Sequence, residues 1–308
     1  MIAQPQVEQA QAPSVALAAS RRRRDVIADY VSLAKPRIGV LLVITEVATM
    51  VVAARGFPGA WLTALAVLGG ALSAGGASAV NCWFDRDIDA VMSRTCTRPV
   101  PSGRIAPWKA LTFGLTLAAA GFAVLAWGTT VLAALLALAG GLFYVVVYTM
   151  WLKRSTTQNI VIGGAAGAFP PLVGWAAVTG SLSLPALALF AVVFFWTPPH
   201  FWALALLLRR QYSAVHVPML PSVAGEATTR RAIVVYSGIL LFVSLLPAIW
   251  LGPVFLWGSL LLGGCLLAMA VRALGDGGLS WAVRLFHYSL LYLAFYFALA
   301  AAAAVLPH

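Results

Sequence analysis

The sequence predicts an all-α membrane protein, a bundle of nine transmembrane helices. Hydrophobic residues make up 62% of the 308-residue chain and only 9% are charged, whereas a soluble domain carries about 25% charged residues. The apolar residues form long runs without charge, and the basic residues lie between these runs. This pattern excludes an ordinary soluble enzyme, a disordered chain and a disulfide scaffold. It also assigns the net charge of +11 to membrane loops, so we expect no nucleic-acid partner.

The apolar runs define the individual helices. A helix that crosses a bilayer needs about 20 mainly apolar residues. The first run, 38–54, is interrupted only by Glu46, and the runs 56–84 and 285–308 each provide one further helix. Three longer runs each provide two helices: 110–152 with a turn near Gly128, 155–208 with a loop at 180–185, and 232–271 with a break near Gly252-Pro253. These runs do not alternate, which excludes a transmembrane β-barrel.

The basic residues predict the orientation of the bundle. If the N-terminus is cytoplasmic, 19 of the 20 Lys and Arg residues lie on the cytoplasmic side, and only Arg55 lies outside. This agrees with the positive-inside rule, because cytoplasmic loops carry an excess of Lys and Arg. The nine-helix count then places the C-terminus on the opposite side.

Residues 1–29 are predicted to be a disordered cytoplasmic tail, and residues 30–308 a single transmembrane domain. Arg21 to Arg24 do not begin a signal peptide, because Asp25 and Asp29 follow them and no apolar run begins before Ile38. We interpret these arginines as an anchor on anionic membrane lipid.

Three of the nine acidic residues lie within five positions, at the cytoplasmic end of the second predicted span: Asp85, Asp87 and Asp89. Asn81, Asp85 and Asp89 are spaced i, i+4, i+8, so on a continuing helix they share one face. One amide and two carboxylates suit Mg²⁺, which takes oxygen ligands and often binds substrate phosphates as well. Asp87 points away from this column and could reach a second ion.

A structural interpretation of these acids remains open, in which they form a solvated helix end paired with Arg86 and Arg94. The position at the membrane favours function, because polar groups there are costly. Further basic residues follow at Arg98 and Arg104, and two more, Lys153 and Arg154, lie on the next cytoplasmic loop.

Carboxylates that hold Mg²⁺ beside Arg and Lys predict a diphosphate site. Inside an apolar bundle, the substrate would be a prenyl diphosphate that ionises to an allylic carbocation in an apolar or aromatic pocket. The positive-inside rule accounts for most of the basic residues but not for the acids.

The N-x-x-x-D-x-x-x-D pattern of Asn81, Asp85 and Asp89 resembles the first acidic motif of the UbiA superfamily of intramembrane prenyltransferases. The similarity runs from about Tyr30 to Leu306 and is densest in residues 81–104, 148–172, 194–202 and 217–221. The stretches 148–172 and 194–202 are similar to the branch of this superfamily that farnesylates haem.

The resemblance implies a nine-helix bundle of UbiA type in a bacterial inner membrane. It implies transfer of the farnesyl group of farnesyl diphosphate to a vinyl group of haem B, which gives haem O and diphosphate. Asn81, Asp85 and Asp89 would hold Mg²⁺. The resemblance assigns catalytic roles to Asp85, Asp89, Arg94 and Lys153, and substrate binding to Asn81, Arg98, Arg154, His200, Arg209, Arg210 and Tyr212. Whether the product passes directly to a haem A synthase stays open.

One position departs from the superfamily pattern. A second acidic motif is expected just before Tyr212, and here Gln211 stands in its place. The nearest acid is Glu226. Gln211 could ligate weakly through its carbonyl oxygen, or Arg209 and Arg210 could replace the charge of a second metal ion.

Two polar residues within the spans have two interpretations each. His200 either contacts haem or is a satisfied polar residue between helices. Glu46 is either functional, or it is protonated or paired with a polar neighbour. We expect the small residues 163–167 to serve close helix packing rather than phosphate binding. The Pro pairs at 170–171 and 198–199 are expected to kink their helices.

Two alternative functions remain at this point. One is a UbiA-type prenyltransferase with an aromatic acceptor such as a quinone precursor. The other is a transporter or haem-binding chaperone without catalysis, which gives no reason for the clustered aspartates.

Overall fold

The computed structural model describes residues 23–275 and 279–306, and within these ranges it contains helices and no strand. Nine of the described helices are long and apolar enough to cross a membrane, as predicted. They are α2 (Pro36–Ala54), α3 (Ala60–Phe84), α5 (Pro107–Gly128), the continuous segment Val131–Ser155, α8 (Asn159–Thr179), α9 (Leu184–Leu207), α12 (Gly225–Leu245), α13 (Ala248–Arg272) and α14 (Ser280–Val305).

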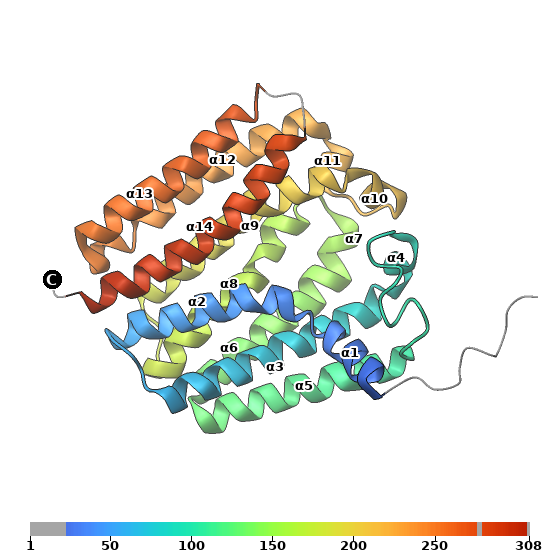
Figure 1. The fold of residues 1–308 in the computed structure, drawn as a ribbon, viewed down its shortest axis with the longest axis horizontal. Helices are drawn as coiled ribbons and strands as arrows, with labels where there is room; N and C mark the ends of the chain where they lie inside the picture. Colours follow the sequence, from blue (N-terminus) through green and yellow to red (C-terminus); the bar gives the residue numbers. More distant parts are fainter. Residues whose placement is uncertain (1–22, 276–278, 307–308) are drawn as a thin grey trace, which may run out of the picture.

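The segment Val131–Ser155 is composite: it consists of α6 (Val131–Leu142), the π-helix η2 (Phe143–Leu152) and α7 (Lys153–Ser155). The remaining helices are short: α1 (Arg23–Leu33), α4 (Arg86–Val91), α10 (Arg209–Ala214) and α11 (Leu220–Val223). Helices α4, α7, α10 and α11 lie at one end of the bundle, at the right of Figure 1, and the C-terminus lies at the other end. The polar segments therefore share one end of the molecule.

Helices α8 and α9 pack against each other at the centre of the bundle. On one side, α8 contacts α2 and α6, and α3 and α5 pack together beyond them. On the other side, α9 contacts α12 and α14, and α13 covers both of these helices. The largest group of buried apolar residues surrounds α9 and α14 and includes Tyr292, Tyr296 and Phe297.

Small residues set the closest helix contacts. A Cβ atom on Gly76 of α3 would lie 2.6 Å from the backbone oxygen of Gly114 on α5, and one on Gly121 would lie 2.7 Å from the oxygen of Gly69. The two helices can approach this closely only because these positions lack a side chain. Gly163 of α8 likewise faces the ring of Tyr148, and Gly164 faces Thr197, as the predicted packing role requires, whereas Gly167 has open space around it.

The breaks between helices follow the sequence signals, with one difference. The turn after Gly128 and the loop after Thr179 lie where predicted. The break expected near Gly252-Pro253 is split: α12 already ends at Leu245, and Gly252 interrupts α13 with φ 78° and ψ −176°. That conformation suits glycine, and Pro253 then starts the long part of the helix.

The predicted boundary between tail and membrane domain falls inside helix α1. Residues 23–29, assigned to a disordered tail, form the first turns of α1. Leu33 of α1 is fully buried, and Asp29 pairs with Arg104 at 3.0 Å. This packing holds the helix, which the apolar-run criterion could not detect because α1 is short and carries charges. Residues 1–22 lie outside the described residues.

The arginine predicted on the opposite side lies away from the polar end. Arg55 ends α2 with φ 53° and donates a hydrogen bond from Nη1 to the backbone oxygen of Trp250 at 3.1 Å. The structure thus separates Arg55 from the site described below. The direction of the bundle across the membrane stays a prediction.

Candidate active site

The column of Asn81, Asp85 and Asp89 forms at the polar end of α3. Asp85 lies between α3 and α4, yet its N–H donates to the backbone oxygen of Asn81 at 2.9 Å, and the N–H of Asp89 donates to that of Asp85 at 2.8 Å. Helical register therefore continues through the junction and keeps the three side chains on one face, as their spacing predicts. All three residues are buried.

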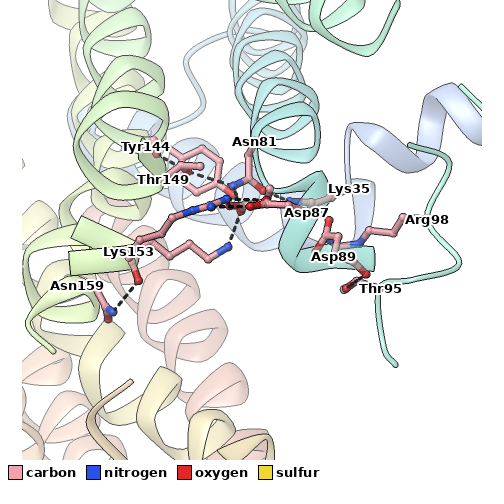
Figure 2. Close-up of polar contacts among 12 residues, drawn as sticks. Lys35, Asn81, Asp87, Asp89, Thr95, Arg98, Tyr144, Thr149, Lys153 and Asn159 are labelled. Carbon is pink, nitrogen blue, oxygen red and sulfur yellow. Dashed lines mark hydrogen bonds and ion pairs between the residues drawn. The ribbon is translucent and has the colours of Figure 1, made fainter. Parts of the chain in front are cut away.

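Asp85 is the centre of a polar network with Asn81, Lys153 and Arg154, and Figure 2 shows Asn81 and Lys153 pointing toward each other in this network. Its Oδ2 atom forms an ion pair with Lys153 Nζ and accepts a hydrogen bond of 2.7 Å from Asn81 Nδ2. Its Oδ1 atom lies 3.5 Å from Nη2 of Arg154. Only 2% of the Asp85 side chain is exposed. A buried carboxylate of this kind needs these partners, because an unpaired buried charge is strongly destabilising.

Asp89 is held by the loop that follows α4. Arg98 Nη1 forms an ion pair with Asp89 Oδ2 at 2.7 Å, and Thr95 Oγ1 donates to the backbone oxygen of Asp89 at 3.0 Å. The loop thus folds back onto the end of the column that Asp89 forms. Because Arg98 is one-third exposed, its guanidinium can reach both the carboxylate and the surrounding solvent.

Asp87 points away from the column, as predicted. Two nitrogens of Arg154 donate to its two oxygens at 2.7 and 2.8 Å. This hydrogen bonding by Arg154 lowers the pKa of Asp87 to about 2. If the acids only formed a solvated helix end, Arg86 and Arg94 would be their partners. Arg86 instead donates a hydrogen bond to the backbone oxygen of Trp83. The cations that contact the acids come instead from the loop after α4 and from α7.

The π-helix η2 places the residues on the other side of the column. Thr149 Oγ1 donates to the backbone oxygen of Tyr144 at 2.8 Å, five residues earlier, and accepts from Asn81 Nδ2 at 3.1 Å. Lys153 and Arg154 follow directly after this helix. π-Helices are rare overall, and those that occur often lie at functional sites. Here the wider turn brings Thr149 into the network.

Lys35 is a site residue that the sequence analysis missed. Its Nζ atom donates to Asn81 Oδ1 at 2.8 Å, across 46 positions of sequence. Sequence reasoning counted Lys35 only toward the positive charge of the cytoplasmic side. A local signal existed, because Lys35 directly precedes Pro36 at the entrance of the first span, where a lysine with no apparent partner requires an explanation.

Arg94 and Tyr212 meet at the edge of this cluster. The side chain of Tyr212 is buried in α10, and the positive charge of Arg94 lies close enough to influence its hydroxyl group. Burial raises the pKa of Tyr212, although Arg94 and Arg98 lower it. The phenol therefore stays protonated at neutral pH and can donate a hydrogen bond to an anion.

The remaining predicted residues of α10 behave differently from one another. Arg209 and Arg210 are exposed and form no ion pair with an acid in the part of the chain that the structure describes. Gln211 has a buried Oε1 atom without a hydrogen-bond partner among the described residues. Glu226 pairs with Arg230 at 2.7 Å and is engaged there.

His200 lies between two aromatic rings in the middle of the bundle. Its ring stacks on Trp196 at 4.3 Å and on Phe286 at 4.7 Å between centroids. The hydroxyl group of Ser289 donates to the backbone oxygen of Phe286, so His200 Nδ1 is the donor to Ser289 Oγ at 2.7 Å. This assigns the proton to Nδ1 and leaves Nε2 as the basic nitrogen.

Glu46 lies in α2, away from the acidic column. It is buried, and its Oε1 atom has no hydrogen-bond partner among the described residues. Its carboxyl group lies against Gly70 of α3, and its backbone lies against Gly174 of α8. The predicted pairing of Glu46 with a polar neighbour is therefore not seen at its Oε1 atom.

The column has the composition of a magnesium site. It offers one amide oxygen and two carboxylates, which is the donor set of a hard cation. In ranges 23–275 and 279–306, no three His, Cys, Asp or Glu side chains are placed so that they alone could hold a metal ion, so the amide of Asn81 would have to complete the donor set. Beside the column, Lys153, Arg154 and Arg98 provide the charge for a multiply anionic ligand.

Comparison with known proteins assigns the family. Residues 41–291 match the UbiA prenyltransferase family. The chain belongs to this family. It is also 54% identical over 273 residues to the protoheme IX farnesyltransferase of Symbiobacterium thermophilum, with 87% of this chain and 91% of that protein covered. Among solved structures, a UbiA homolog from Archaeoglobus fulgidus bound to GPP and Mg²⁺ has a TM-score of 0.65 at 15% identity, with 88% of this chain and 99% of that chain covered.

Membership of the UbiA family agrees with the nine spans, and the chain is a multi-pass integral membrane protein. Some relatives are longer. The protoheme IX farnesyltransferase of Chloroflexus aurantiacus is 54% identical over 280 residues, which cover 89% of this chain but 47% of that protein. The chain thus spans about half the length of such relatives.

Proposed function

We propose that this protein transfers the farnesyl group of farnesyl diphosphate to a vinyl group of haem B, giving haem O and diphosphate. The observation that carries the proposal is the buried column of Asn81, Asp85 and Asp89 with cations on both sides, at the polar end of an apolar bundle. The names of the relatives support the choice of haem as acceptor.

The diphosphate would bind between the column and the surrounding cations. Asn81, Asp85 and Asp89 would hold Mg²⁺, which when bound withdraws charge from the leaving diphosphate. A UbiA homolog of the same fold has been solved with GPP and Mg²⁺, which supports this assignment. Lys153 and Arg154 both contact Asp85 of the column and would donate to diphosphate oxygens as the bond to the farnesyl carbon breaks. Removing one such donor typically lowers a rate by about 10²–10³.

The carbocation would form toward the apolar interior. Tyr144 and Tyr148 stack at 5.8 Å between centroids on η2, just above Lys153. Their ring faces can stabilise a cation that has left the diphosphate. The terminal vinyl carbon of haem B then forms a bond to the farnesyl carbon. Water adds to the resulting haem cation and loses a proton, which completes the hydroxyethylfarnesyl group.

Haem B would approach from the side of α9 and α14. His200 is held between Trp196 and Phe286, and its basic Nε2 atom can contact the haem or its iron. Arg94 and Arg98 lie near the column and can bind propionates or diphosphate oxygens. A haem A synthase is a natural recipient of the product and belongs to the same proposal.

We further propose that one Mg²⁺ suffices here. The position of the second acidic motif holds Gln211, whose orphaned buried oxygen can ligate only weakly. Arg209 and Arg210 are exposed beside it and can supply positive charge to the same region.

The proposal is tested with purified protein, farnesyl diphosphate, Mg²⁺ and haem B. We expect a haem of greater mass and longer retention. Asp85→Asn should abolish turnover and leave haem binding intact, whereas the matched variant Asp25→Asn, at an exposed position of α1, should retain activity. Unchanged activity of Asp85→Asn would remove the acidic column from the mechanism. Prenylation of an aromatic acceptor with no change in haem would favour the alternative acceptor class.

A further inference from the structure

Lys35 engages the one oxygen that Asn81 can offer to a metal ion. The Nδ2 atom of Asn81 already donates to Asp85 at 2.7 Å and to Thr149 at 3.1 Å. This fixes the orientation of the amide and leaves Oδ1 as its ligand atom. That atom accepts the hydrogen bond from Lys35 Nζ at 2.8 Å.

The backbone holds Lys35 in this position at a cost. Lys35 has φ 51° and ψ 56°, in the left-handed region, and it directly precedes Pro36. Left-handed conformations are unfavourable for a residue with a side chain and persist where the surrounding structure enforces them, often at functional sites. The neighbouring Ala34 packs on α3 at Gly75, where an added Cβ would lie 3.2 Å from the Ala34 Cβ. The turn is therefore pressed against the helix that carries Asn81.

The same arrangement recurs along the column. Lys153 pairs with Asp85 and Arg98 pairs with Asp89, so an oxygen of each predicted metal ligand contacts a cation of the chain itself. With Arg154 on Asp87, four contacting cations face three carboxylates. A metal ion alone would add to this excess of positive charge, whereas a metal ion together with a diphosphate brings compensating negative charge.

We propose that Lys35 competes with Mg²⁺ for Asn81 Oδ1 and moves to an anionic oxygen of the diphosphate when Mg²⁺ and diphosphate bind together. The metal then enters the site with its substrate and not before it. Lysine suits this exchange because its ammonium group is a compact charge on a flexible stem, with three donors that can be redirected. The inference rests on the proposed diphosphate substrate and assigns Lys35 a part in binding it.

Two binding measurements on Lys35→Gln test this inference. Mn²⁺ alone, followed by electron paramagnetic resonance, reports on the metal site without substrate. Inorganic pyrophosphate with Mg²⁺, followed by calorimetry, reports on the joint site. We expect Lys35→Gln to bind Mn²⁺ alone more tightly than the wild type does. We expect it to bind Mg²⁺-pyrophosphate about tenfold more weakly, as for the loss of one charge-assisted hydrogen bond.

Lys109→Gln is the matched control. Lys109 is exposed on α5 beside Trp108 and belongs to the same polar end of the bundle. It should change neither affinity, so any effect of removing one positive charge in general is subtracted. Lys35→Arg keeps the charge and should retain the weak binding of Mn²⁺ alone.

The two affinities of Lys35→Gln should change in opposite directions, which distinguishes competition with the metal ion from a general loss of structure. If Lys35→Gln weakens both Mn²⁺ and pyrophosphate binding, Lys35 only supports the fold and the inference is overturned. Unchanged affinities overturn it as well. If pyrophosphate binding is unchanged and haem affinity falls, Lys35 serves a propionate and the inference is again wrong. A wild-type protein that binds no pyrophosphate would instead contradict the proposed function itself.

Discussion

At the scale of single residues, charge placement determines what the site can bind. The chain has nine acidic residues, and three of them form one cluster. Asp85 and Asp89 are buried and each pairs with a cation, whereas the side chain of Asp87 is 60% exposed. A buried carboxylate needs a close partner, because an unpaired buried charge is strongly destabilising. An exposed ion pair contributes little to stability. The three aspartates are therefore not equivalent.

Asp87 provides a pH test of this difference. Arg154 holds its pKa near 2, below the ordinary value of 3.8. The stabilisation from this pair is thus complete above about pH 4 and is lost as the pH falls toward 2. Because the pair is exposed, we expect Asp87→Asn to lower stability by less than about 1 kcal/mol at pH 7. Thermal unfolding in detergent should show this difference vanishing between pH 4 and pH 2; a difference that grows in acid would contradict the assignment.

At the scale of elements, the π-helix η2 and the glycine contacts position the site. The wider turn of η2 places Thr149 between Asn81 and the backbone of Tyr144. Close packing of α5 on α3 supports the helix from which the column projects. Both features depend on backbone geometry rather than on charged side chains.

Thr149→Val tests the contribution of η2. The variant keeps the shape of the side chain but removes one of the two acceptors of Asn81 Nδ2, so Asp85 and Lys35 alone then orient the amide. We expect the transfer rate to fall about tenfold, as for loss of one buried hydrogen bond, with little change in unfolding temperature. Thr116→Val, which removes a hydrogen bond within α5 on an exposed face, should leave the rate unchanged. Equal transfer rates for both variants would show that Thr149 of η2 does not help to position Asn81.

Gly76→Ala tests the α3–α5 contact. The new Cβ would meet the backbone of Gly114 at 2.6 Å, and a backbone cannot yield as a side chain can. We expect destabilisation of about 1–3 kcal/mol, the usual cost of overpacking. Gly264→Ala in α13 has open space within 4 Å and should be neutral or stabilising. Unfolding of both variants in detergent checks this, and a stable Gly76→Ala protein would contradict the packing.

Much of this organisation could be predicted from the sequence. Charge-free runs predict all nine spans because the bilayer sets their length, and the i, i+4, i+8 spacing of Asn81, Asp85 and Asp89 predicts their shared face. Lys35 and Thr149 could not be found in this way, since their partners lie 46 and 68 positions distant and depend on how helices pack. Helix α1 was missed because tertiary contacts, not hydropathy, stabilise it.

At the scale of the whole molecule, the cations that contact the acidic column lie with it at one end of the bundle, and Arg55 lies away from it. If the N-terminus is cytoplasmic, both substrates reach the site from the cytoplasmic face. We expect a reporter enzyme that is active only outside the cytoplasm to be inactive when fused after residue 154 and active when fused after residue 305. The reverse pattern would overturn the predicted orientation, because Arg55 would then mark the cytoplasmic side.

The proposed reaction of this bundle joins a farnesyl group to haem. The most direct measurement offers purified protein farnesyl diphosphate, Mg²⁺, haem B and an aromatic quinone precursor in one reaction, and then determines the masses of all products. We expect a haem that has gained one farnesyl group and one hydroxyl group, with release of diphosphate and an unmodified aromatic acceptor. Unmodified haem beside a prenylated aromatic compound would contradict it.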